Sequence, residues 1–129
     1  MARTEIPVTV STHDGVNLPA PTPTDPTNDM EIADNDGSIV LILENLSLST
    51  RTVIVEAAAT YGVPAIPLVD RTYTLGTGTD ASARQTAGPF SRRLFNQTGD
   101  HSSQSVLVNF DGPAADVDVE AISVPIPVT

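Results

Sequence analysis

Hydrophobic and polar residues alternate along much of the chain with the two-residue period of β-strands. The most apolar segment is residues 38–45 (SIVLILEN), in which both alternating sets of positions are apolar, a pattern typical of a strand that is covered on both faces. Residues 52–57 (TVIVEA) follow after a polar turn, and the two segments together predict a hairpin. No helical period of useful length appears, so we expect an all-β protein.

Four more segments have the composition or the alternation of strands, namely residues 69–75, 90–95, 104–110 and 116–121. Within the first of them, Val69, Tyr73 and Leu75 share one face. After residue 121 the apolar positions shift to the opposite parity, beginning at Ile122, which predicts a bulge or a change of partner strand. Many short strands separated by turn signals predict one antiparallel β-sandwich, of jelly-roll or immunoglobulin-like type, or a small barrel.

Residues 1–37 differ from the rest of the chain in being acidic and rich in proline. Residues 5–11 (EIPVTVS) have strand-like composition, and residues 18–27 (LPAPTPTDPT) contain too many prolines for a helix. We therefore divide the chain into an extended N-terminal arm, residues 1–37, and a β-sandwich body, residues 38–129. The stiffness of the proline-rich segment lowers the entropy lost on docking, so we expect the arm to pair with neighbouring chains.

The C-terminal segment alternates proline with β-branched residues in 124–128 (VPIPV). Pro125 and Pro127 lack N–H groups on the same side of an extended chain, which predicts an edge strand that can pair on one side only. Contacts with other chains are expected at the apolar and proline positions of both ends and at the one basic pair, that is, at Ile6, Val8, Val10, Leu18, Pro19, Pro21, Pro23, Pro26, Arg92, Arg93, Val124, Ile126 and Val128.

The 129 residues have a formal net charge of −10, with 16 acidic residues against six arginines and no lysine. This balance argues against nucleic acid and against anionic membrane surfaces as partners. Cysteine is absent, which excludes disulfides, thiol nucleophiles and thiolate metal sites. The acidic excess without lysine has two interpretations, a GC-rich genome that prefers arginine codons or adaptation to high salt.

No constellation of catalytic residues is predicted. His13 and His101 each neighbour an aspartate, and His101 also precedes two serines, but these residues lie in turn-like segments without the fixed geometry that a catalytic triad needs. We therefore expect neither enzymatic activity nor a cofactor. Tyr61 is the one clear loop aromatic for an alternative function, a carbohydrate- or receptor-binding module.

The strongest candidate for a metal site is the acidic run at residues 29–36. Asp29, Glu31, Asp34 and Asp36 supply the oxygen ligands that hard cations prefer. The spacing nevertheless fails the calcium-loop pattern, because with Gly37 as its glycine the first and last ligand positions fall on Ile32 and Leu43. We expect a solvated acidic segment here, with weak divalent binding between subunits as the alternative.

The basic pair Arg92–Arg93 lies between Phe90 and Phe95. Two arginines flanked by aromatic residues could hold an acidic partner or the acidic N-terminal arm of the same chain. An exposed strand end without a partner is the other interpretation of this pair.

Several short elements resemble a group of small virion proteins of tailed viruses. They are residues 2–9 (ARTEIPVT), 15–20 (GVNLPA), 35–37 (NDG) before the apolar strand, 88–90 (GPF) and 94–97 (LFNQ). The resemblance implies a β-sandwich head protein that decorates or cements a capsid and often forms trimers at three-fold positions of the shell. The insert of residues 22–36 and the lack of lysine depart from that pattern, and a haloarchaeal tailed virus would suit the composition.

These observations together predict a structural virion protein on the outer surface of a viral head. Its expected partners are the major capsid protein and copies of itself, as a homotrimer, and we expect neither nucleic acid nor membrane as a partner. An acidic protein fits the outside of the shell, since packaged DNA would repel it. A head–tail connector or a tail protein would differ from this assignment only in location.

Overall fold

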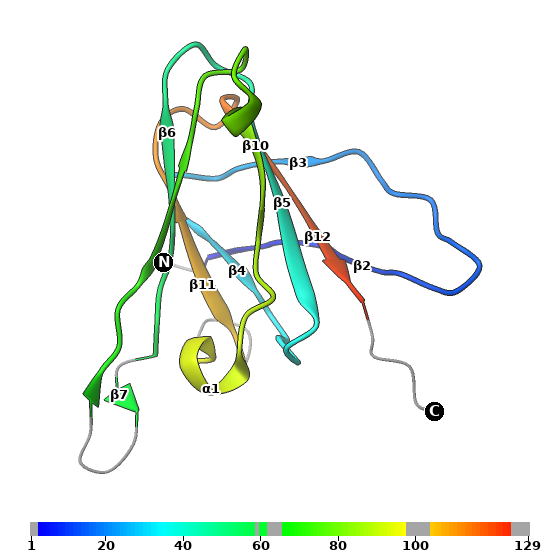
Figure 1. Ribbon diagram of the computed structural model, residues 1–129, viewed down its shortest axis with the longest axis vertical. Coiled ribbons are helices and arrows are strands. Elements are labelled where there is room, and N and C mark those ends of the chain that lie inside the picture. The colour runs from blue at the N-terminus through cyan, green and yellow to red at the C-terminus, as the bar shows by residue number, and fades with distance from the viewer. Residues whose placement is uncertain (1–2, 59, 62–65, 98–103, 125–129) are drawn as a thin grey trace.

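The computed structural model describes residues 3–58, 60–61, 66–97 and 104–124, and the side chains of residues 60–61 and 66–67 are left aside. Almost all regular structure in these residues is β (Figure 1). Two mixed sheets share one hydrophobic core, an arrangement compatible with a β-sandwich. The expected all-β class is therefore confirmed, whereas the expectation of purely antiparallel pairing is wrong.

Sheet A contains five strands. In spatial order they are β1 (Thr4–Glu5), β4 (Met30–Ile32), β11 (Val106–Phe110), β6 (Arg51–Val55) and β9 (Arg71–Leu75). All neighbours are antiparallel except β1 and β4, which run parallel.

Sheet B is built around the two longest strands, β5 (Ile39–Asn45) and β12 (Val117–Ser123), which pair antiparallel over their whole length. On the far side of β5 lies β10 (Arg84–Ala87). The other edge of β12 is shared by β3 (Thr22–Pro23) and the parallel strand β2 (Val8–Val10).

The remaining elements are short. A two-stranded ladder joins β7 (Thr60–Tyr61) to β8 (Ile66–Pro67). One 3-10 turn, η1 (Ala81–Ala83), precedes β10, and one helical turn, α1 (Arg92–Phe95), precedes β11.

The core lies between the sheets and is mainly aliphatic, with Phe90 and Phe110 as its aromatic members. Every second residue of β5 and β12 is buried, and the intervening residues are half-exposed. The inner positions of both sheets form one cluster, which also contains Ile6 and Phe90 from outside the strands.

The prediction that residues 38–45 are covered on both faces is wrong. Leu41 and Leu43 are fully buried, but Val40 and Ile42 on the opposite face are only half-buried. Neighbouring side chains of the same sheet shield the outer positions in part. Apolar residues that are partly exposed in this way are common on protein surfaces.

The predicted hairpin of residues 38–45 and 52–57 is also wrong, because β5 belongs to sheet B and β6 belongs to sheet A. Residues 46–50 cross from one sheet to the other. A polar turn after a strand is compatible with a hairpin within one sheet and with a crossing between two sheets. Which of the two forms depends on long-range packing.

Two further predictions are wrong, the strand at residues 90–95 and the orientation of Val69. Residues 90–95 form the helical turn α1 after a buried Phe90 instead of a strand. Val69 precedes β9 and is 86% exposed, so it does not share the face of Tyr73 and Leu75. Residues 90–95 (FSRRLF) are apolar only near their two ends, and so short a pattern does not distinguish a strand from a helical turn.

The apolar positions change parity after residue 121, but the buried face of β12 does not, because Ser123 is buried and Ile122 is only half-buried. The register between β12 and β5 continues without a bulge to Ser123. On its other edge, β12 pairs first with β3 at Asp118 and Val119 and then with β2 from Ala121 onward.

Residues 1–37 do not form an arm separate from the body. Their strands β1 and β4 join sheet A, and β2 and β3 join sheet B. Ile6 is fully buried, and its N–H donates to the Glu31 carbonyl at 2.8 Å. The alternation of residues 5–11 indicates a strand, but it does not reveal whether the partner strand lies in the same chain or in another. The boundary at residue 37 therefore falls within the body.

Candidate interaction surfaces

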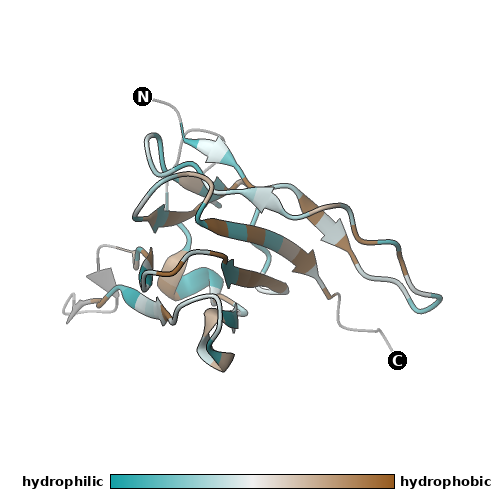
Figure 2. Cartoon of the chain, turned by 90° about the horizontal axis from the view of Figure 1, so that it is seen from above, coloured by the Kyte–Doolittle hydropathy of each residue, from teal (hydrophilic) through white to brown (hydrophobic). Residues whose placement is uncertain are grey.

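One segment of the N-terminal region does stand away from the body. The Ser11 N–H still donates to the Ser123 carbonyl at 2.8 Å, after which residues 12–21 are exposed without interruption until β3 begins at Thr22. Figures 1 and 2 show this loop projecting from the sheets. We call residues 12–21 the extension.

The extension carries apolar side chains into solvent, Val16 at 45% and Leu18 at 51% exposure. A turn begins it, in which the Thr12 hydroxyl donates to the Gly15 carbonyl at 2.8 Å and the Gly15 N–H donates to the Thr12 carbonyl at 3.0 Å. Gly15 has φ +88°, a conformation that glycine adopts without steric cost. Pro19 and Pro21 restrict the return path, so the extension is a stiffened loop.

The base of the extension is β2, which forms the end of sheet B. Among the described residues, none pairs with its outer edge. Backbone groups of successive residues in a strand point to opposite edges, and Ser11 points toward β12. Thr9 therefore shares the orientation of Ser11, whereas Val8 and Val10 direct their N–H and C=O groups away from the sheet.

The side chains of Val8 and Val10 point toward the space between the sheets, yet they are 39% and 52% exposed. Together with the buried Ile39 and Ser123 they line a pocket of about 330 Å³. The rest of the lining consists of Glu5, Ala33, Asp34 and Asp36. The space between the sheets is thus open to solvent beside β2, with apolar walls and an acidic rim.

The carboxylate of Asp36 at this rim accepts hydrogen bonds from the hydroxyl and from the N–H of Ser38. These bonds, and to a smaller extent the nearby charge of Arg92, hold the pKa of Asp36 below its ordinary value. The Asp36 carboxylate at the rim is therefore ionised at neutral pH.

The four acidic residues considered as metal ligands are not brought together. Asp29 accepts a bond from the Phe110 N–H at 3.2 Å, Glu31 is fully buried in β4, and only Asp34 and Asp36 line the pocket. In the described part of the chain, no group of three acidic or histidine side chains has the geometry for a metal ion.

Arg92 and Arg93 are exposed on α1. Phe90, just before this turn, is buried and packs edge-to-face against Phe95 with the ring centroids 5.5 Å apart. Arg92 lies close enough to Asp36 to affect its pKa, so this part of the basic pair faces the chain's own acidic segment.

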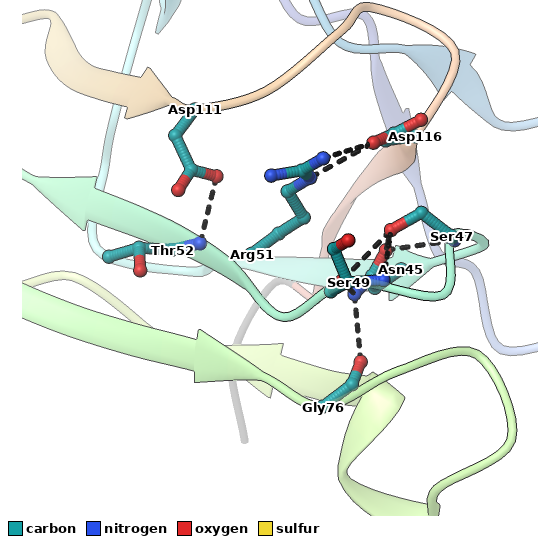
Figure 3. Close-up of polar contacts among 8 residues, drawn as sticks. All are labelled: Asn45, Ser47, Ser49, Arg51, Thr52, Gly76, Asp111 and Asp116. Carbon is teal, nitrogen blue, oxygen red and sulfur yellow. Dashed lines mark hydrogen bonds and ion pairs between the residues drawn. The ribbon is translucent and has the colours of Figure 1, made fainter.

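A second exposed apolar site lies at the crossing between β5 and β6, which Figure 3 shows in close-up. Leu46 and Leu48 are 53% and 84% exposed. The side chain of the buried Asn45, the residue before Leu46, holds the loop. Its oxygen accepts bonds from the N–H and hydroxyl of Ser47, and its NH₂ donates to the Ser49 and Gly76 carbonyls.

The same loop is anchored by charge. The Arg51 guanidinium donates twice to one carboxylate oxygen of Asp116, at 2.7 and 2.9 Å, and Asp111 accepts from the Thr52 N–H (Figure 3). The two leucines are therefore presented on a fixed loop. No pattern in the sequence marks these two leucines as a contact site, although Asn45 and Ser47 have the spacing of a side-chain turn in which an Asn oxygen accepts the N–H two residues on.

The other residues expected to contact partners are dispersed. Leu18, Pro19 and Pro21 lie on the extension, whereas Pro23 is in β3 and Pro26 is half-buried. Val124 is 54% exposed beside β2, and its N–H donates to the Ser38 carbonyl. Ile126, Val128, Pro125, Pro127 and His101 lie outside the described residues, and His13 is exposed on the extension.

The chain was compared with family models, with curated proteins and with solved structures, and nothing matches in any of the three. Among the described residues, no helix is both long and apolar enough to cross a bilayer.

Proposed function

We propose that the chain is a structural virion protein that binds the outer surface of a viral head and stabilises it through contacts with the major capsid protein and with copies of itself. The sequence elements that resemble small virion proteins of tailed viruses support this proposal. Two sheets around one core fit the β-sandwich class, of jelly-roll or immunoglobulin-like type, that we propose for the body.

The observation that carries the proposal is the extension. Ten consecutive residues leave a sheet edge, expose Val16 and Leu18, and return to the same edge. Burying such side chains on a partner removes apolar surface from water. The prolines and the turn at Gly15 limit the entropy that docking would cost.

The charge of the chain supports an outward position on the shell. A net charge of −10 repels packaged nucleic acid, so an inner position would be unfavourable. We propose that the extension contacts the major capsid protein, while the body faces solvent.

The proposal is tested on tailed-virus particles purified from a culture whose viral genome carries the gene. Mass spectrometry should find the chain in amounts comparable with the major capsid protein. Protease should cut the purified chain within the exposed residues 12–21, whereas in intact particles the same residues should be protected because the major capsid protein covers them. Particles that lack the chain, or that hold only a few copies at the neck or tail, would contradict the assignment to the head surface.

A further inference from the structure

The space between the sheets is not filled by side chains at the end where β2 lies. Val8 and Val10 stand across from Ala121 and Ser123 of β12, so all four side chains point toward the inside of the molecule. Ala121 and Ser123 are buried, whereas Val8 and Val10 are 39% and 52% exposed. Protein interiors are close-packed, so two inward-facing valines in contact with water mark a place where a further side chain fits.

The pocket at this end has the dimensions of a site for one side chain. Its volume of about 330 Å³ is near the lower limit of pockets that hold small molecules, about 300–1,000 Å³. Val8, Val10 and the buried Ile39 give it an apolar wall. Such a wall suits a hydrocarbon stem, which gains free energy when it leaves water.

Three carboxyl groups stand around the mouth of the pocket, and they come from different segments. Glu5 belongs to β1, whereas Asp34 and Asp36 lie between β4 and β5, and all three residues are exposed. An ammonium group donates in three directions and meets carboxylates on several sides, while a planar guanidinium favours a bidentate contact with one of them. The exposed Arg92 lies near Asp36 but is not among the residues that line the pocket.

We propose that this pocket takes a lysine side chain of a partner protein, with the methylene stem against Val8, Val10 and Ile39 and the ammonium group at the carboxylates of the rim. The chain itself has no lysine, so the side chain must come from a different protein. The inference rests on the proposed function for the identity of that protein, the major capsid protein. Because β2 leads directly into the extension, a partner that holds the extension also reaches the pocket, and the rest of the body still faces solvent.

The stem should contribute more to affinity than the charge. An ion pair between exposed groups increases affinity by no more than about fivefold. Each methylene that leaves water adds about fourfold, and lysine has four of them. Binding in the pocket should therefore depend on the length of the stem, which distinguishes it from a general attraction of cations to an acidic surface.

The first test is an NMR titration of the purified full-length chain with Nα-acetyl-lysine amide. We expect saturable shifts of the Val8 and Val10 methyl signals. The norleucine analogue, which lacks the ammonium group, should bind more weakly. An amine whose stem is two methylenes shorter should bind about tenfold more weakly or less. Equal affinity for the long and short amines, or no saturable shift with the lysine amide, would overturn the proposal.

A pair of variants separates the rim from the overall charge. Asp34→Asn removes an exposed carboxylate of the rim and should weaken binding of the lysine amide by about two- to fivefold. The matched control, Asp80→Asn, removes the same charge from an exposed turn near the other end of β5, where the Gly78 N–H donates to the Ser47 carbonyl. The control should bind like the wild type, and equal weakening by both variants would contradict a site at the pocket.

The second test identifies the partner in tailed-virus particles treated with a carbodiimide, which joins a carboxylate to an amine with loss of water and leaves no spacer. Mass spectrometry should find amide bonds from Asp34 or Asp36 to a lysine of the major capsid protein. Particles that contain the chain but lack these bonds would overturn the inference and leave the proposed function intact. Particles without the chain would contradict the proposed function and, with it, the choice of partner.

Discussion

Asp118 of β12 stands directly across from Glu44 of β5, so two carboxylates are neighbours on the outer face of sheet B. Burial, and then the Glu44 charge, raises the pKa of Asp118. Like charges at opposed positions of adjacent strands destabilise a sheet. The two carboxylates therefore weaken the pairing of β5 and β12, in which the other residues alternate regularly between buried and half-exposed positions.

We predict that Asp118→Asn stabilises the protein at neutral pH. Because the folded state holds the Asp118 proton more tightly than the unfolded state, ionisation disfavours folding as the pH rises through the raised pKa. Urea unfolding at pH 7 should show a gain of about 0.2–1 kcal/mol, which disappears below the ordinary pKa of 3.8. Glu120→Gln, across from Ile42, is the control and should have a smaller effect. A loss of stability on Asp118→Asn at pH 7 would contradict this reading.

Asn45→Ala should destabilise the chain strongly, because the Asn45 side chain is buried and fixes the crossing between the two sheets. The variant leaves the buried Gly76 carbonyl without its donor, at a cost of about 1–3 kcal/mol for a buried polar group left unsatisfied, and it also removes the donor to the carbonyl of the exposed Ser49. Chemical denaturation measures the loss. Ser47→Ala removes a half-buried hydroxyl that donates to Asn45 but leaves the bonds from the Asn45 NH₂ in place, so it should cost less than half as much. Equal losses would show that the crossing does not depend on Asn45.

Phe90 and Leu48 should respond in opposite ways to truncation. Phe90 is 1% exposed and Leu48 is 84% exposed. Phe90→Ala should cost about 3–5 kcal/mol in the free energy of unfolding. Leu48→Ala should change it by less than about 0.5 kcal/mol, as at most exposed positions. A large loss from Leu48→Ala in the isolated protein would mean that Leu48 is packed, which would remove the reason to regard it as an interaction residue.

Two changes in the N-terminal region should show that the strands of residues 1–37 are needed for folding, whereas the extension is not. Replacing residues 12–20 with about six Gly and Ser residues can span the gap between β2 and β3 and should leave the melting temperature nearly unchanged. Deleting residues 1–37 removes β1 to β4 and the buried Ile6, Met30 and Ile32, so that chain should not fold. Circular dichroism distinguishes these outcomes. A folded 38–129 fragment would instead support the predicted division of the chain into an arm, residues 1–37, and a body, residues 38–129.

The longer strands could be predicted from the sequence because their alternation is local. The segments predicted at 104–110 and 116–121 correspond to β11 and β12 within two residues at each end. Their inward valines, such as Val106 and Val117, are buried as the pattern indicates. Alternation with a period of two depends only on one face of the strand being buried, so it can be recognised without knowing the partner strand.

The pairing could not be predicted in the same way. Residues 4–5, 8–10 and 22–23 are too short to carry a pattern, and their partners are distant in sequence, from 26 residues for Thr4 and Met30 to 113 residues for Val8 and Ala121. The choice between hairpin and crossing at residues 46–50 depends on the contacts of Asn45 with Gly76, which local turn chemistry does not reveal. The exposed apolar residues of the extension and β2 become meaningful only when the unpaired edge is known.

Binding to viral heads tests the central claim most directly. Particles from a virus in which the gene is deleted are mixed with purified wild-type chain or with the variant in which a Gly-Ser linker replaces residues 12–20, and bound copies are counted by gel densitometry and cryo-electron microscopy. We predict that the wild-type chain saturates regular positions on the outer surface, whereas the folded variant binds weakly or not at all. Equal saturation by both proteins, or no binding by the wild type, would contradict the account.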